Sequence, residues 1–349
     1  MLNIDIMFYN NCGWNDVFAV FSNSQGITIP YCIEMKNVNG KLYSCNVDFE
    51  NYNYVYFTCK KGICTVLTSF NQHCFAFMPN GCSFNGILCL EIYHILSDTP
   101  DVEKIIFDYD NKIKKEVYVW TPRSYTHNKN KRYGVIYMFD GQNLFYKNST
   151  GYGSWNVHQT MELTGGYIVV AINNADLYRD SQLTPEIGAV RDNYIENFSH
   201  GTGAEFAQFL IDKIIPYINT NYNVFTDKEH TAVCGSSSGG LESFYMGMMY
   251  SEIFGCVGAL SPAIALYDSK IWKNFFQQIS LDTPPRLYMY TGDNDIAEKE
   301  LSVGVVKMKE YLDNKLEYKS EIVFDYLQDN YHNEACWSGA FIRFADMLK

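Results

Sequence analysis

The sequence contains no hydrophobic run long enough to span a membrane and no dense cluster of basic residues. Its net charge is −12, and its two short basic runs, 112–115 and 129–132, are expected on solvated loops or an edge strand. These features argue against nucleic acid or a membrane as a partner. Residues 1–7 lack the basic start and apolar core of a signal peptide and are predicted to form a strand. We therefore expect a cytoplasmic protein, or a secreted one if a signal has been removed.

A Cys-x-x-Cys pair is also absent, which leaves a zinc site weakly supported. Eight of the eleven cysteines nevertheless lie before residue 90. Such a set could form a disulfide framework in an exported protein. Because no export signal is seen, we favour free thiols that act as small buried apolar side chains.

The length of 349 residues and the 47% share of hydrophobic residues predict two globular domains. Residues 1–97 show short alternating strands separated by turn signals, which is typical of a β-sandwich. Residues 98–349 contain continuous apolar runs, such as 133–139 and 167–172, and apolar residues at helical spacing across 203–221. Strands that alternate with helices predict an α/β domain with a doubly wound, mainly parallel sheet.

A Gly-x-Ser-x-Gly turn lies between a run of small and β-branched residues, 231–234, and a helix-like segment, 241–250. A nucleophile elbow needs this order of strand, sharp turn and helix, with small residues two positions either side of the serine. Gly235 and Gly239 meet that condition around Ser237, which is the predicted nucleophile. A Gly/Ser-rich turn can also be a flexible connection or a phosphate-binding loop.

A serine nucleophile needs a histidine base and a carboxylate that orients it. In doubly wound hydrolases the chain order is serine, acid, histidine, so only His332 has the required place among the seven histidines. The acid is expected after the strand at 286–290, where Asp295 is preferred and Asp293 or Glu298 is the fallback. An oxyanion hole needs two backbone N–H donors, which we assign to Gln142 and Ser238.

Several separate motifs, in order along the chain, give the sequence a resemblance to the putative esterase family. They are Asp140-Gly141-Gln142-Asn143, Gly235-Ser236-Ser237-Ser238-Gly239, Leu260-Ser261-Pro262 and His332-Asn333-Glu334-x-x-Trp337. That family includes feruloyl and acetylxylan esterases of carbohydrate esterase family 1. The resemblance implies an α/β-hydrolase fold, a triad of Ser237, Asp295 and His332, and no cofactor or metal. Ser238 departs from the methionine that the family usually has there, and Arg179 lies where the family often has an arginine.

The opening of the front domain, with Trp14 following Asn10-Asn11-x-Gly13, resembles starch-binding-type carbohydrate-binding modules. Trp14 and Tyr9 are the expected sugar-stacking residues, unless both fill the sandwich core. Trp337 is expected to contact the substrate of the second domain. The predicted function is a serine esterase that removes acetyl or feruloyl groups from a carbohydrate. The alternatives are a siderophore or thioester hydrolase, an acyltransferase, or a glycan-binding protein with an inactive hydrolase domain.

Overall fold

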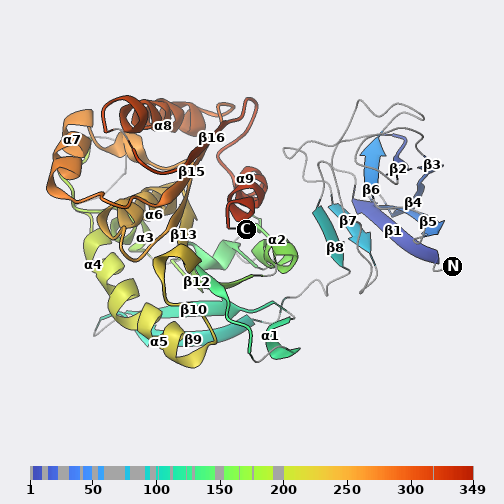
Figure 1. The fold of residues 1–349 in the computed structure, drawn as a ribbon. Helices are drawn as coiled ribbons and strands as arrows, with labels where there is room; N and C mark the ends of the chain where they lie inside the picture. Colours follow the sequence, from blue (N-terminus) through green and yellow to red (C-terminus); the bar gives the residue numbers. More distant parts are fainter. Residues whose placement is uncertain are drawn as a thin grey trace. The chain divides into compact units, whose positions relative to one another are not determined.

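The chain divides into two compact units, Met1–Thr99 and Pro100–Lys349 (Figure 1). The computed structural model describes residues 3–9, 15–22, 31–39, 42–48, 54–58, 75–78, 91–94, 100, 102–110, 113–122, 124–127, 130–145, 153–164, 166–174, 177–191, 200–316 and 318–348. Among these residues, no helix is both long enough and apolar enough to cross a bilayer.

The first unit contains two sheets, with strand orders β4-β5-β1-β7-β8 and β3-β2-β6. Phe8 of β1 and Phe57 of β6 are fully buried, and their rings stack 4.4 Å apart. This contact joins one sheet to the other, as in a sandwich. The strands are β1 (Asn3–Tyr9), β2 (Phe18–Ser22), β3 (Tyr31–Glu34), β4 (Lys36–Asn39), β5 (Leu42–Asp48), β6 (Tyr54–Thr58), β7 (Phe75–Met78) and β8 (Glu91–His94).

Cys32 and Cys45 of this unit carry free thiols. Cys45 is buried, as expected of a cysteine that acts as a small apolar side chain. The other six cysteines before residue 90 lie outside the described residues.

The second unit is built on one eight-stranded sheet of order β16-β15-β14-β13-β11-β12-β10-β9. β10 pairs antiparallel with both β9 and β12. The other six strands, β11 to β16, are parallel to one another. The strands are β9 (Val102–Asp108), β10 (Lys114–Trp120), β11 (Gly134–Met138), β12 (Tyr167–Ile172), β13 (Thr231–Ser236), β14 (Cys256–Leu260), β15 (Arg286–Thr291) and β16 (Ile322–Tyr326).

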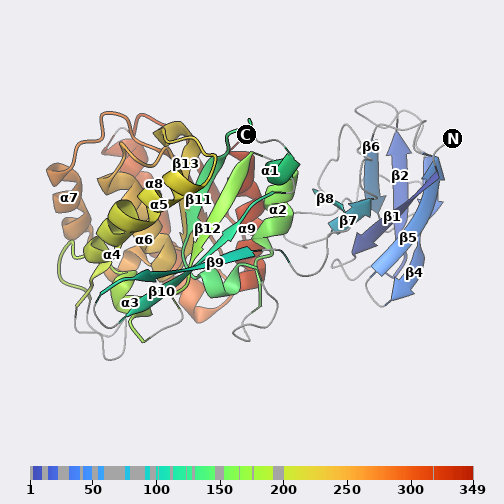
Figure 2. The same ribbon diagram turned by 90° about the horizontal axis from the view of Figure 1, so that it is seen from below.

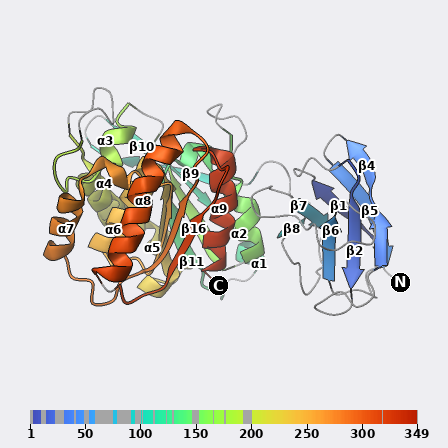
Figure 3. The same cartoon turned by 90° about the horizontal axis from the view of Figure 1, so that it is seen from above.

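Helices cover both faces of this sheet: Figures 2 and 3 show α2 and α9 on one side and α4, α6 and α7 on the other. The α-helices are α1 (Ser124–His127), α2 (Val157–Thr164), α3 (Arg179–Gln182), α4 (Gly203–Phe209), α5 (Ile215–Asn221), α6 (Ser238–Met249), α7 (Ser269–Gln278), α8 (Ile296–Asn314) and α9 (Glu334–Asp346). Two short 3-10 turns, η3 (Gly141–Asn143) and η6 (Ile264–Leu266), follow β11 and β14.

Alternation along the buried strands supplies a core on each face. In β11, Val135 and Tyr137 belong to the cluster under α4 to α8, whereas Ile136 and Met138 belong to the cluster under α2 and α9. All four side chains are at most 1% exposed. A strand buried on both faces has no polar side, which explains why the sequence shows a continuous apolar run here.

The helix expected across 203–221 is present as a continuous helical segment, but its α-helical geometry is interrupted by η4 (Leu210–Ile214), a π turn between α4 and α5. Pro216 explains the interruption, since proline cannot donate the next helical hydrogen bond and the widened turn accommodates its ring. Lys115, expected on a solvated segment, is 1% exposed, and its Nζ donates to Gln182 Oε1 at 2.5 Å. The buried ammonium is tolerated because the amide oxygen accepts from it.

The parallel strands bring distant parts of the chain to one edge of the sheet. Because β11, β13, β14, β15 and β16 run in the same direction, the loops that follow them meet at their carboxyl ends. These loops carry Asp140, Ser237, Ser261, Asp295 and His332. The predicted chemistry is therefore concentrated on a single edge.

Candidate active site

Ser237 lies in a strained turn between β13 and α6. Its backbone has φ 57° and ψ −123°, a conformation that few non-glycine residues adopt. A Cβ at Gly235 would come within 2.5 Å of the carbonyl oxygen of Gly239, so a larger residue cannot occupy position 235 without moving the turn. The Ser237 N–H donates to Leu260 O at 2.9 Å, which ties the turn to β14. The turn has the geometry predicted for a nucleophile elbow.

His332 lies in the loop between β16 and α9 and faces the serine. Its Nε2 is 3.0 Å from Ser237 Oγ although the two residues are 95 positions apart in the chain. At that distance a neutral imidazole with Nε2 unprotonated accepts the hydroxyl proton. The structure therefore brings together the predicted nucleophile and the predicted base.

The carboxylate at the other imidazole nitrogen belongs to Glu298, not to Asp295. Glu298 Oε2 is 2.6 Å from His332 Nδ1, and the Glu298 side chain is completely buried. Its Oε1 accepts from Ser261 Oγ at 2.6 Å and from the backbone N–H of Gly292 at 2.6 Å. This carboxylate is positioned to hold the imidazole in the tautomer that leaves Nε2 free for the serine.

Asp295, the preferred acid on the sequence, is occupied by backbone N–H groups. Its Oδ1 accepts from Glu298 N at 2.8 Å as the N-cap of α8, and its Oδ2 accepts from His332 N at 2.6 Å. Asp295 thus fixes the loop that carries the imidazole without reaching the ring. Asp293 contacts the same loop, since its Oδ1 accepts from Asp329 N at 2.9 Å.

The pattern Asp295-x-x-Glu298 could have shown this division of roles. An aspartate followed three residues later by a glutamate marks a helix N-terminus, where the aspartate caps the backbone. The cap uses the shorter side chain, and the glutamate, in the first turn of the helix, keeps its carboxylate for another partner. Distance from the strand end, on which the preference for Asp295 was based, does not separate a capping aspartate from a catalytic acid.

The charge of Glu298 is stabilised although the residue is buried. Burial raises the pKa of the carboxyl, but hydrogen bonds from His332, Gly292 N–H and the Ser261 hydroxyl outweigh it and lower the pKa below the ordinary 4.5. Thr291 Oγ1 contributes a further contact, 3.1 Å from Oε1. A carboxylate held ionised at neutral pH can stabilise the imidazolium that forms when His332 takes a proton.

Trp337, predicted to contact substrate, is buried behind the imidazole. It is 6% exposed, and its ring stands edge-on to the His332 ring with centroids 4.8 Å apart. Its Nε1 donates to Ser261 Oγ at 3.0 Å, and that hydroxyl in turn donates to Glu298. Its position in the first turn of α9 places it on the face of the helix that packs onto the sheet, and its contact with substrate stays a prediction. Trp337 supports the imidazole and the acid.

Gln142 and Ser238, the predicted oxyanion donors, come from two segments that meet beside Ser237. Gln142 is in η3, where its Nε2 donates to Asp140 Oδ1 at 3.0 Å and its Oε1 accepts from Asn174 N at 3.0 Å. Ser238 is the first residue of α6, where backbone N–H groups have no partner within the helix. A Cβ at Gly239 would lie 3.3 Å from Phe139 Cβ, so glycine lets the end of β11 approach the elbow.

An ion pair that the sequence interpretation did not assign holds the η3 loop. Asp140 has a left-handed backbone, with φ 55°, and its two oxygens accept from Arg179 Nε and Nη2 at 2.7 Å each. Arg179 Nη1 also donates to Asp180, whose Oδ1 is 3.4 Å from Ser238 Oγ. Burial lowers the pKa of the Arg179 guanidinium, but the carboxylates of Asp140 and Asp180 raise it by more. The net pKa therefore lies above its ordinary value. A chain of contacts thus joins the η3 loop, which carries Gln142, to the start of α6, which carries Ser238.

The two aromatic residues predicted to contact glycan, Trp14 and Tyr9, belong to the first unit. Trp14 lies outside the described residues. Tyr9 ends β1, where its backbone is in register with Leu42 of β5 and Phe75 of β7. Their roles remain predictions.

Comparison with known proteins places the second unit in a family. The family model "Putative esterase" matches residues 111–342. An endo-1,4-beta-xylanase/feruloyl esterase of Xylanibacter ruminicola is 29% identical over 138 residues, which is 38% of this chain and 17% of that protein. The chain thus spans a small part of that relative's length.

Solved structures show the same fold at low identity. A CE1 ferulic acid esterase of Anaeromyces mucronatus has a TM-score of 0.50 and 21% identity, covering 70% of this chain and 89% of that one. The siderophore hydrolase EstA of Aspergillus nidulans has a TM-score of 0.53 and 17% identity, covering 71% and 95%. The eight-stranded sheet with helices on both faces is therefore an α/β-hydrolase fold, and the chain belongs to the putative esterase family.

Proposed function

We propose that this protein hydrolyses carboxylic esters through an acyl-enzyme formed on Ser237. The observation that carries the proposal is the unbroken series of contacts from Ser237 Oγ to His332 Nε2, at 3.0 Å, and from His332 Nδ1 to Glu298, at 2.6 Å. Family membership supports the same reaction class. In this proposal the acid is Glu298, and Asp295 positions the histidine loop.

The reaction begins when Ser237 Oγ attacks the ester carbonyl carbon while its proton moves to His332 Nε2. The negative charge that develops on the carbonyl oxygen is stabilised by the N–H groups of Gln142 and Ser238, an effect worth about 3–4 kcal/mol per donor in other hydrolases. The imidazolium then gives its proton to the leaving alcohol. A water molecule, deprotonated by His332, attacks the acyl-enzyme and releases the carboxylic acid.

Replacement of Ser237 by alanine tests this assignment. We expect Ser237→Ala to lower kcat on p-nitrophenyl acetate by at least about 10³-fold, because the mutant cannot form the acyl-enzyme. The matched control is Ser236→Ala, since Ser236 ends β13 and makes no contact with the imidazole among the described hydrogen bonds. Activity that persists in Ser237→Ala would exclude Ser237 as the nucleophile.

For the substrate, we infer an acetyl or feruloyl group attached to a carbohydrate. The xylanase/feruloyl esterase relative supports a feruloyl group, and the resemblance of residues 1–97 to carbohydrate-binding modules supports a glycan. A panel of acetylated xylan, feruloylated arabinoxylan fragments and methyl ferulate tests the inference. We expect kcat/KM to be highest on a sugar-linked ester. A preference for siderophore esters or thioesters would instead place the protein with the siderophore hydrolases that share its fold.

A further inference from the structure

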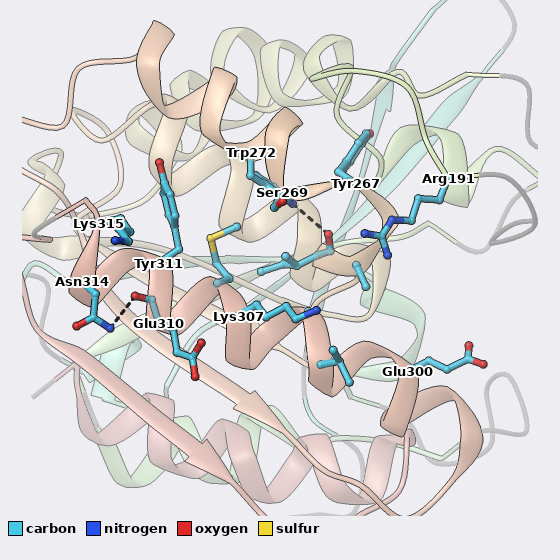
Figure 4. Close-up of a pocket in the computed structure, with 15 residues that line it drawn as sticks. Arg191, Tyr267, Ser269, Trp272, Glu300, Lys307, Glu310, Tyr311, Asn314 and Lys315 are labelled. Carbon is cyan, nitrogen blue, oxygen red and sulfur yellow. Dashed lines mark hydrogen bonds between the residues drawn. The ribbon is translucent and has the colours of Figure 1, made fainter.

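A cavity of about 460 Å³ lies between α7, α8 and the η6 turn, apart from the Ser237 centre (Figure 4). Neither Ser237, His332 nor Glu298 is among its lining residues. The volume is within the range of sites that hold small organic ligands. Nothing in the proposed hydrolysis uses this cavity.

The cavity has an apolar interior formed by side chains from both of its walls. Its apolar lining residues include Ile264 of η6, Trp272 of α7, and Val303 and Met308 of α8. Val303 is 53% exposed, whereas Ile264, Trp272 and Met308 are each at most 4% exposed. An exposed valine beside an otherwise buried apolar wall offers contact area to a ligand.

Two cations lie at one end of the cavity. Figure 4 shows the ammonium of Lys307 and the guanidinium of Arg191 at the same end, with Glu310 at the opposite end. Arg191 Nε and Nη2 both donate to Asp268 Oδ1, at 2.9 and 2.6 Å, so this guanidinium is held in place. Among the described residues, Lys307 has no hydrogen-bond or ion-pair partner.

The remaining charged residues of the lining define which ligand charge fits. Glu300 also lines the cavity near Lys307, but Figure 4 shows its carboxylate directed away from the Arg191 guanidinium. Lys315 lies at the other end, close to Asn314. Because Asp268 already pairs with Arg191, Lys307 is the cation without a counter-ion at this end among the described residues. This end is therefore suited to a single anion, and the interior between the ends is suited to an apolar group.

We propose that this cavity binds a small aromatic carboxylate. The carboxylate accepts from Lys307 Nζ and from the Arg191 guanidinium, and the ring packs against Val303 and Trp272. Acids released by ester hydrolysis can belong to this class, but the proposal does not depend on the proposed function.

Calorimetric titration of the full chain with 3-phenylpropionate and with its neutral analogue 3-phenylpropanol tests the proposal. We expect the carboxylate to bind at least about tenfold more tightly than the alcohol, since only the carboxylate pairs with Lys307. Lys307→Glu and Lys307→Gln are each expected to weaken carboxylate binding by about tenfold or more. Lys273→Glu is the matched control, because Lys273 is exposed on α7 and does not line the cavity.

Four outcomes would overturn the proposal. They are equal affinity for the acid and the alcohol, unchanged acid binding in both Lys307 variants, an equal loss of binding in Lys273→Glu, and the absence of any binding up to about 10 mM. Because Lys307 is exposed, its variants are expected to keep the wild-type melting temperature and the basal rate on p-nitrophenyl acetate. These two measurements serve as the control for folding.

Discussion

Two carboxylates contact His332, and they do so at different atoms. Glu298 meets the ring at Nδ1, whereas Asp295 accepts from the backbone N–H. Both carboxylates attract the charged ring, but only Glu298 also accepts a hydrogen bond from it, so Glu298 is expected to stabilise the imidazolium more strongly. The two residues can therefore be separated by kinetics.

Glu298→Gln is expected to lower kcat on p-nitrophenyl acetate by about 10²–10⁴-fold, because the amide cannot stabilise the imidazolium and can favour the wrong tautomer. Asp295→Asn is expected to lower kcat by less than about tenfold, because asparagine remains a good N-cap for α8. Steady-state kinetics on both variants, with melting temperatures as the folding control, make the comparison. A larger kcat loss in Asp295→Asn than in Glu298→Gln would return the role of acid to Asp295.

Arg179 holds the loop that carries Gln142, one of the two proposed oxyanion donors. Its two hydrogen bonds to Asp140 hold a left-handed residue directly before η3, and removal of the guanidinium leaves that 5%-exposed carboxylate without its cation. We expect Arg179→Ala to lower kcat by about 10–100-fold with little change in KM. Arg179→Lys is expected to restore only part of the loss, since lysine cannot form the bidentate pair. A change confined to KM would show that Arg179 acts on substrate binding instead.

At the scale of helices and strands, most of the site could be predicted because local patterns determine it. The run of small and β-branched residues at 231–234 and the glycines around Ser237 specify the buried strand and the tight turn. The π turn before Pro216 was not predicted, and Glu298 was only a fallback for the acid, since each depends on how a helix begins or continues. The Asp140–Arg179 pair could not be foreseen, because only the fold brings these distant residues together.

The helix α2 carries a buried histidine that should make stability depend on pH. His158 is 2% exposed, and neither ring nitrogen has a hydrogen-bond partner among the described residues. Burial lowers its pKa from 6.5 to about 4. Between those values the unfolded chain binds a proton that the folded chain does not, so stability falls as the pH drops from 6.5 towards 4.

His158→Leu is expected to flatten that dependence. The shift of pKa corresponds to about 3 kcal/mol of unfolding free energy lost across the window in the parent protein. The variant should not lose this free energy as the pH falls, because leucine does not titrate and suits the apolar surroundings of α2. Urea unfolding at several pH values between 4 and 7 measures the effect. Equal slopes in the parent and the variant would show that His158 is not the responsible group.

At the scale of the whole molecule, the second unit holds every residue of the proposed esterase site. Ser237, Glu298, His332 and the Asp140–Arg179 pair all lie within Pro100–Lys349. The first unit contributes none of them. If residues 1–97 bind glycan, their removal should therefore lower activity on polymeric substrates and leave activity on small esters unchanged.

Removal of residues 1–99 is expected to leave kcat/KM on p-nitrophenyl acetate within about twofold of the parent value. On insoluble feruloylated xylan we expect a loss of about fivefold or more, because the effective concentration of the enzyme at the polymer falls. Trp14→Ala in the full chain should reproduce the second effect if that ring stacks on sugar. Equal rates on the polymer before and after truncation would argue against glycan binding by this unit.

Labelling with a fluorophosphonate, followed by peptide mass spectrometry, tests most directly whether Ser237 is an activated nucleophile. We expect a single phosphonyl group on the peptide that contains Ser237 and much slower labelling in His332→Ala, since the hydroxyl 3.0 Å from Nε2 depends on that base. An unlabelled protein, or a label on another residue, would contradict the proposed site.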